Sequence, residues 1–274
     1  MTIFPDHAAD MELSQTAAAA GFQLLHVTRA ESTNVAALRA VEAGADRFWV
    51  VADEQSAGRG RHGRTWQSPP GNLYASVGLN APCPPASTPL LGFVAGLSLA
   101  EAILALAPDL AGALHLKWPN DCQLDGAKLA GILLEGTSLP GGKTGVAVGI
   151  GVNIAHFPEG LDQRATALAL HVDGIDPASL FEALSTRIAA NLALFGAGDG
   201  FAAIREGWLR HALPLGTRLR VRLPSGERHG AFAGLDETGH LLLETNGVTE
   251  TVMVGDVFPV TDVLSPEAAL RTVG

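Results

Sequence analysis

The feature that most constrains this chain is an almost uninterrupted apolar stretch from Leu90 to Ala107. It carries one acidic residue, Glu101, near its middle and stops at Pro108. Its length and its internal charge favour a helix buried in a protein core over a membrane span. The 274-residue chain is long enough to build a large core around such a helix without disulfides.

Hairpin and helix patterns flank this stretch. Asp125-Gly126 is a typical two-residue hairpin turn, and Lys128–Glu135 follows it as the partner strand. Hairpins mixed with helices favour an α+β fold over a doubly wound α/β fold. Other strands are predicted at Gln23–Arg29, Phe48–Ala52, Asn72–Leu79, Leu114–Trp118, Gln123-Leu124 and Thr144–Ile154, and other helices at Val35–Ala43, Ser179–Phe195 and Phe201–His211.

The pattern changes near Pro214, where short β-rich segments replace the helices. Strands are predicted there at Arg218–Leu223, Gly230–Gly234, Leu241–Glu244 and Val248–Val254. Their spacing is typical of a small β-barrel. We therefore predict a loosely held lead-in over residues 1–21, a main domain over 22–213, a small β-domain over 214–263 and a tail over 264–274.

The charge balance is acidic, with 28 acidic and 18 basic residues and a net charge of −10. No nucleic-acid partner is predicted, because proteins that bind phosphate backbones usually present a basic face. Cys83 and Cys122 lie far apart and form no metal-binding pair, which is typical of reduced thiols in a cytoplasmic protein. No export signal is visible near Met1, and no membrane partner is predicted.

The densest chemical signal is the loop Gly58–Trp66, where three glycines are interspersed with Arg59, Arg61 and Arg64. Glycine lets a backbone approach a ligand and expose its N–H groups, and arginine offers a permanently charged fork. The loop therefore predicts a site for a phosphate-bearing anion. The alternatives are a flexible arginine–glycine loop or a weak nucleic-acid patch.

A second signal is the motif Lys117-Trp118-Pro119-Asn120-Asp121, with Lys128 across the hairpin turn. Asp121 is a candidate ligand of Mg²⁺ or a group that orients a nucleophile. Lys128 is a candidate for holding developing negative charge. The alternative is a hairpin with ordinary solvated charges.

Two shorter motifs carry less information by themselves. Ser32-Thr33-Asn34 precedes a predicted helix, so by itself it predicts an N-cap. Gly149-Ile150-Gly151-Val152-Asn153 predicts a buried strand against which another backbone packs closely.

In this order, these motifs resemble those of the biotin protein ligases. The matching segments are Glu31–Asn34, Gln55–Trp66, Lys117–Asp121 with Lys128–Glu135, and Gly149–Asn153, within a resemblance that covers residues 22–260. Four ordered motifs outweigh the separate structural alternatives. His62 stands where many bacterial members carry another arginine.

The resemblance implies a mixed β-sheet catalytic domain flanked by helices, of the biotin/lipoate ligase type, followed by a small SH3-like β-barrel. It implies that biotin and ATP, with Mg²⁺, form biotinyl-5′-AMP. A lysine of a biotin carboxyl carrier protein, of the acetyl-CoA carboxylase type, then accepts the biotinyl group. It also implies a cytoplasmic enzyme, and family precedent allows a homodimer.

The resemblance also assigns the site residues. Arg61, Lys128 and Asp121 are the predicted catalytic residues, and Asp121 acts either through a metal or as a base. The predicted biotin-binding residues are Ser32, Thr33, Asn34, Gln55, Gly58, Arg59, Gly60, Arg61, Lys128 and Gly131. The predicted ATP-binding or adenylate-binding residues are Arg59, Arg61, Arg64, Trp66, Asn120, Lys128 and Asn153. Trp66 packs either on adenine or in the core.

Three other functions compete with this prediction. A lipoate ligase is related in fold and also forms an acyl-adenylate, but the complete arginine–glycine loop and the Lys117–Asp121 motif argue against it. A biotin-sensing repressor needs an N-terminal DNA-binding domain, for which the segment before Ser32 is too short, so a monofunctional ligase is expected. The third is a pure binding protein. A gel-shift assay and biotin-dependent ATP–pyrophosphate exchange separate these functions.

Overall fold

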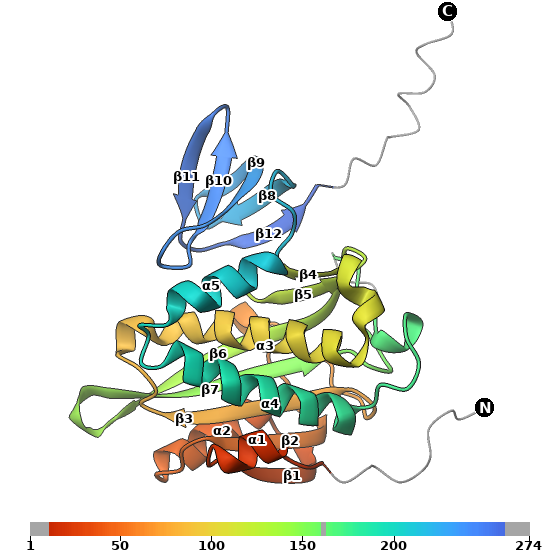
Figure 1. Cartoon of the computed structure of the whole chain (residues 1–274), viewed down its shortest axis with the longest axis vertical. Coiled ribbons are helices and arrows are strands. Elements are labelled where there is room, and N and C mark those ends of the chain that lie inside the picture. Colours follow the sequence, from red (N-terminus) through yellow and green to blue (C-terminus); the bar gives the residue numbers. More distant parts are fainter. Residues whose placement is uncertain (1–10, 160–162, 261–274) are drawn as a thin grey trace, which may run out of the picture.

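A computed structural model describes residues 11–159 and 163–260, and it contains two β-sheets (Figure 1). The larger sheet has seven strands in the order β1-β2-β3-β7-β6-β5-β4. β1 and β2 are parallel, and the other neighbours are antiparallel, so the predicted α+β class with a mixed sheet is confirmed. The strands are β1 (Gln23–Ala30), β2 (Phe48–Gln55), β3 (Leu73–Asn80), β4 (Leu114–Lys117), β5 (Asp121–Leu124), β6 (Ala127–Leu139) and β7 (Lys143–Val152).

Helices cover the two faces of this sheet unequally. In β2, the side chain of Trp49 packs edge-on against Phe181 of α4 (Pro177–Phe195), whereas its neighbour Val50 packs with Ala37 of α2 (Thr33–Glu42). Successive side chains of a strand point to opposite faces, so α2 and α4 lie on opposite sides. Figure 1 shows α3 (Leu91–Leu106), α4 and α5 (Phe201–Arg210) stacked on the α4 side.

The apolar stretch forms α3, as predicted, and all its residues from Leu91 to Ile103 except Glu101 are buried. By length and composition, the segment Pro85–Leu106 could cross a membrane. In this fold, however, the apolar side chains of α3 belong to the main core together with those of the sheet, α4 and α5.

The predicted loose lead-in is wrong for its last residues, because Gln15–Ala19 form a short helix, α1. The Ser14 side chain accepts a hydrogen bond from the Ala17 N–H, and the Ser14 N–H donates to Ser185 Oγ of α4. Alanine is the best helix former, and Ala17 is fully buried in the core. Residues 1–10 and the predicted tail, 264–274, lie outside the described residues.

The smaller sheet is antiparallel, in the order β11-β10-β9-β8-β12, which is consistent with the SH3-like barrel. Its strands are β8 (Arg218–Leu223), β9 (Gly226–Leu235), β10 (Leu241–Thr245), β11 (Val248–Val252) and β12 (Asp256–Pro259). β9 begins four residues before its predicted start at Gly230, and β12 is a strand that was not predicted. The domain limits at 22–213 and 214–263 stay a prediction.

The turn between β9 and β10 joins the two sheets. The Trp118 indole N–H donates to the Gly239 carbonyl at 3.0 Å, and a Cβ on Gly239 would lie 2.7 Å from the Phe93 ring. The Arg205 guanidinium of α5 donates to the Leu235 carbonyl of β9. The small sheet therefore packs against the main domain through a close aromatic contact.

We predict that Gly78→Ala destabilises the packing of α2 on the sheet. A Cβ on Gly78 of β3 would lie 2.8 Å from Val41 Cγ2 and 3.0 Å from the Ala37 carbonyl, and the helix backbone cannot easily move away. The expected loss is about 1–3 kcal/mol of unfolding free energy, measured by urea denaturation. Gly136→Ala is the control, because its Cβ would have no neighbour closer than 3.5 Å. Equal losses in both variants would contradict close packing at Gly78.

Candidate functional site

A cavity of about 640 Å³ lies between the α2 face of the large sheet and β12, within the size range of small-molecule sites. All the predicted site residues line it except Gly58. Gly58 supports the loop instead. A Cβ there would lie 2.4 Å from the Trp66 carbonyl, and the Gly58 carbonyl accepts a hydrogen bond from the Trp66 N–H.

One part of the cavity is polar but uncharged. Gln55 Oε1 accepts hydrogen bonds from the Thr33 N–H and hydroxyl, and Gln55 Nε2 donates to Ser68 Oγ. Ser32 occupies the N-cap position of α2, as predicted, but its side chain makes no capping hydrogen bond. Within the described ranges, the buried Ser32 hydroxyl makes no side-chain hydrogen bond and stays available to a ligand.

Asn34 is buried and fully engaged by the protein. Its amide group donates to the Leu133 carbonyl and to Glu135, and its Oδ1 accepts from Ser76. A Cβ on Gly149 would lie 2.3 Å from Asn34 Oδ1, so glycine is required at that position of β7. Asn34 therefore fixes α2 to the sheet rather than offering a free polar group.

Two more predicted asparagines hold neighbouring backbone. Asn120 Oδ1 accepts from Arg61 Nη1 at 3.0 Å, and its amide group donates to the Ile132 carbonyl. The Asn153 amide group donates to the Thr166 carbonyl. Asn120 therefore orients an arginine of the loop, and Asn153 fixes the segment beside the cavity.

Paired glycines of β6 and β7 form a floor for Trp66. Gly131 lies opposite Gly151 in the ladder, and a Cβ on either would come within 3.1 Å of the indole ring. Lys128 Nζ lies 5.5 Å from the centre of the same ring. The indole N–H is buried without a hydrogen-bond partner among the described residues.

A β-bulge brings Lys128 to the cavity. Asp121 pairs with Gly131 and Cys122 with Ala130, but Gln123 pairs with Lys128, so Leu129 is the extra residue. Regular alternation would place Lys128 and Asp121 on opposite faces of the sheet. The bulge turns Lys128 to the face of Asp121, and Lys128 Nζ lies 2.6 Å from Asp121 Oδ1.

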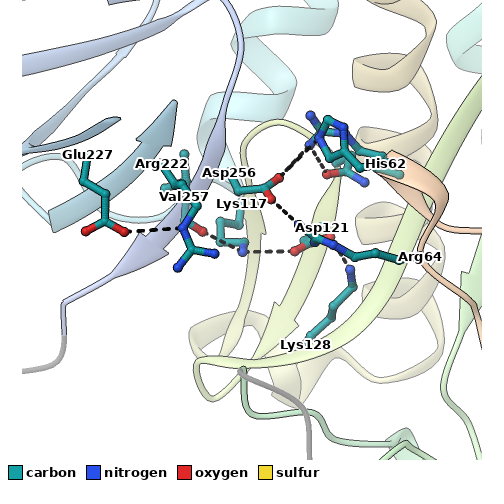
Figure 2. A network of polar contacts seen from close by, with 11 residues as sticks. His62, Arg64, Lys117, Asp121, Lys128, Arg222, Glu227, Asp256 and Val257 are labelled. Atoms are coloured by element: carbon teal, nitrogen blue, oxygen red, sulfur yellow. Dashed lines mark hydrogen bonds and ion pairs between the residues drawn. The ribbon is translucent and has the colours of Figure 1, made fainter. Parts of the chain in front are cut away.

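Asp121 is the buried centre of the charged network in Figure 2. Its other oxygen lies 3.0 Å from Lys117 Nζ, which also donates to the Val257 carbonyl of β12. Burial alone would raise the pKa of the Asp121 carboxyl, but the ammonium groups of Lys117 and Lys128 outweigh burial and lower it. Asp121 is therefore a carboxylate that orients two lysines.

Asp256, at the start of β12, holds the arginine–glycine loop (Figure 2). Its oxygens lie 2.5 Å from Arg64 Nη2 and 3.5 Å from Arg61 Nη1, with His62 Nε2 at 3.9 Å. Burial raises the pKa of the Asp256 carboxyl, but the hydrogen bond and charge of Arg64, with the charges of Arg61 and His62, lower it overall.

Three charged residues that line the cavity have no predicted role, namely Lys117, Arg222 and Asp256. Lys117 is the first residue of the Lys117–Asp121 motif, and its place in that motif could have indicated a role in the site. Arg222 lies within the predicted strand Arg218–Leu223, which carries no motif, and Asp256 belongs to a strand that the sequence pattern does not predict. Their placement depends on how the small sheet packs.

Comparisons with known proteins agree with this geometry. Residues 25–154 match the Biotin/lipoate A/B protein ligase family, and residues 215–258 match the Biotin protein ligase C terminal domain. A biotin--[acetyl-CoA-carboxylase] ligase of Paracoccus denitrificans is 38% identical over 241 residues, which are 85% of this chain and 98% of that protein.

Two solved structures share the fold. Biotin protein ligase from Aquifex aeolicus in complex with biotin and ATP has a TM-score of 0.71 and 30% identity, covering 86% of this chain and 97% of that one. The Leishmania major enzyme in complex with biotinyl-5-AMP has a TM-score of 0.60 and 29% identity, covering 85% and 99%. The chain therefore belongs to the biotin/lipoate A/B protein ligase family. Within that family, its predicted resemblance to the biotin protein ligases is confirmed.

We predict that Asp121→Asn costs about 3–5 kcal/mol of unfolding free energy at pH 7, because it leaves buried ammonium groups without their carboxylate. The folded-state pKa of Asp121 is lowered, so its ionisation stabilises the fold above the ordinary carboxyl pKa of about 4. This contribution disappears as the pH falls through the folded-state pKa. Urea denaturation from pH 7 to pH 3 should show the variant and the wild type converging. A constant difference would contradict the charge-based explanation.

We predict that Asp256→Asn loosens the arginine–glycine loop, because the charge that holds Arg61 and Arg64 is lost. Hydrogen exchange of the amides from Gly60 to Thr65 should become faster, whereas exchange in α3 should not change. Glu227→Gln is the control, since Glu227 pairs with Arg220 and Arg222 of β8 and with no residue of that loop. Unchanged loop exchange in Asp256→Asn would contradict the clamp.

Proposed function

We propose that this chain activates biotin with ATP and transfers the biotinyl group to a lysine of a biotin carboxyl carrier protein. The observation that carries the proposal is one cavity that joins an uncharged polar region to a group of cationic side chains. Gln55, Ser68 and the Trp66 carbonyl form a chain of hydrogen bonds from the first region, and the Trp66 ring contacts Lys128 of the second.

The uncharged region suits the biotin ureido ring. That ring is neutral and needs hydrogen-bond donors and acceptors rather than charges. Ser32 has an uncommitted hydroxyl, and Gln55 is held in place by Thr33 and Ser68 with part of its amide still free. We propose that Ser32 and Gln55 contact biotin, and that Thr33 and Asn34 position them.

The cationic region suits two anions that must react with each other. In the proposed first step, a biotin carboxylate oxygen attacks the α-phosphorus of ATP, and pyrophosphate leaves. The guanidinium groups of Arg59, Arg61 and Arg64 offset the repulsion between carboxylate and phosphate. Lys128 Nζ, held by Asp121, stabilises negative charge at the reacting oxygen.

In the proposed second step, a carrier lysine attacks the acyl carbon and AMP leaves. Asp121 is poorly suited to be the base for this lysine, because its pKa is lowered and both its oxygens contact ammonium groups. The same two positive charges disfavour Mg²⁺ at Asp121. Among the described residues, no three acidic, histidine or cysteine side chains gather as a metal site. Mg²⁺ therefore stays a prediction as a companion of the ATP phosphates.

We propose that the small sheet closes the nucleotide side of the cavity and helps dock the carrier. Asp256 and Val257 of β12 contact the arginine–glycine loop and Lys117, and Phe258 lines the cavity. Tests of this role need point variants, because the core is continuous between the sheets and a truncation would expose it. The homodimer, the cytoplasmic location and the absence of nucleic-acid and membrane partners stay predictions.

We predict that Lys128→Gln lowers biotin-dependent ATP–pyrophosphate exchange by about two to three orders of magnitude, because it removes the positive charge beside the reacting oxygen. A streptavidin blot of a carrier domain should show a similar loss. Lys143→Gln is the control, because Lys143 is exposed at the other end of β7. Thermal unfolding of both variants separates lost chemistry from lost stability. Full exchange activity in folded Lys128→Gln would contradict the proposed role.

A further inference from the structure

The chain uses arginine almost exclusively for positive charge. It contains fifteen arginines and three lysines, Lys117, Lys128 and Lys143. Lysine and arginine differ in reactivity toward the proposed intermediate, because an uncharged lysine amine attacks an acyl-adenylate. The guanidinium group stays protonated in proteins and does not react in this way.

Two of the three lysines are held inside the cavity network. Lys117 Nζ and Lys128 Nζ lie 3.0 Å and 2.6 Å from the oxygens of Asp121, and their side chains are 5% and 17% exposed. An ammonium paired with a carboxylate has no free lone pair. Neither lysine is therefore presented as a nucleophile to an acyl group in the cavity.

The third lysine lies far from the cavity. Lys143 begins β7 at the tip of the long β6–β7 hairpin, opposite Leu139 of β6 (Figure 1). Gly151, which lines the cavity, is eight residues further along the same strand. At about 3.3 Å per residue, the two positions are about 26 Å apart. A reactive acyl group held beside Gly151 cannot reach Lys143 without leaving the protein.

Among the described residues, the exposed lysines and arginines that line the cavity are all arginines. Arg59 and Arg64 of the loop and Arg222 of β8 line the cavity with 49% to 59% of each side chain exposed. Arg228, a surface arginine outside the cavity, is 49% exposed. A lysine would supply the same charge at these positions, and it would add a nucleophile close to the activated acyl group.

We infer that the exclusion of free lysines from the rim of this cavity protects the chain from acylating itself, so that the first amine to meet the acyl-adenylate is a partner's lysine. The inference rests on the proposed function. In the reaction avoided here, the amine lone pair attacks the acyl carbon and a C–N bond forms. The C–O bond to phosphate breaks, AMP leaves as an anion, and the amine proton passes to solvent.

The test compares Arg222→Lys with Arg228→Lys in the full chain. The two arginines form a matched pair, because each side chain is 49% exposed and each is paired with a glutamate, Glu227 or Glu250. Arg222 lines the cavity, whereas Arg228 does not. Each variant is incubated with biotin, ATP and Mg²⁺, and biotin on each of its own lysines is measured by mass spectrometry.

We expect the new side chain in Arg222→Lys to carry about tenfold or more biotin than that in Arg228→Lys or than Lys143, because it is held beside the activated acyl group. Gln67→Lys, at another exposed position that lines the cavity, should behave like Arg222→Lys. Equal labelling at cavity and distant positions, in variants that unfold like the wild type, would overturn the inference.

A carrier domain added to parallel reactions separates this inference from the proposed function. Carrier biotinylation by the wild type with equal labelling of all introduced lysines rejects only the inference. No carrier biotinylation and no pyrophosphate exchange by the wild type reject the proposed function, and the inference with it.

Discussion

The arrangement of the cavity depends on the buried carboxylate of Asp121. It holds Lys128 on one side and Lys117 on the other, and Lys117 continues the contact to the Val257 carbonyl of β12. Asp256, the residue before Val257, forms ion pairs with Arg61 and Arg64 of the loop. These contacts bring together the arginine–glycine loop, the strands that carry Lys117 and Lys128, and β12, which are far apart in the sequence.

Burial explains why this network must be complete. A charge inside a protein is costly unless it is paired, and removing one partner leaves the others uncompensated. The chain as a whole has a net charge of −10, yet among the described residues its cavity is lined by six of its 18 lysines and arginines and by two carboxylates, Asp121 and Asp256. The local excess of positive charge is therefore a property of the fold rather than of the composition, and it suits anionic reactants.

Glycines set the shape of the same cavity. Gly131 and Gly151 leave room for the Trp66 ring, and Gly149 leaves room for Asn34. A methyl group at Gly149 or Gly151 would overlap a neighbouring side chain at less than 3 Å. The strand Gly149–Asn153 was predicted to be packed closely by another backbone, whereas the side chains of Asn34 and Trp66 are what lie against Gly149 and Gly151. These glycines let the tryptophan and the asparagine lie close against the strands, and these two side chains position the polar groups.

The sequence by itself determined the elements whose signals are local. The Asp125-Gly126 turn has positive φ at both residues, α3 follows from its apolar run, and the family motifs converge on one cavity. Only the tertiary structure decided that a bulge at Leu129 turns Lys128 toward Asp121, and that Asp256 meets Arg64 from 192 residues away. Turn and helix preferences act over a few neighbouring residues, whereas a bulge or a distant ion pair depends on which strands pack together, and no local pattern records that.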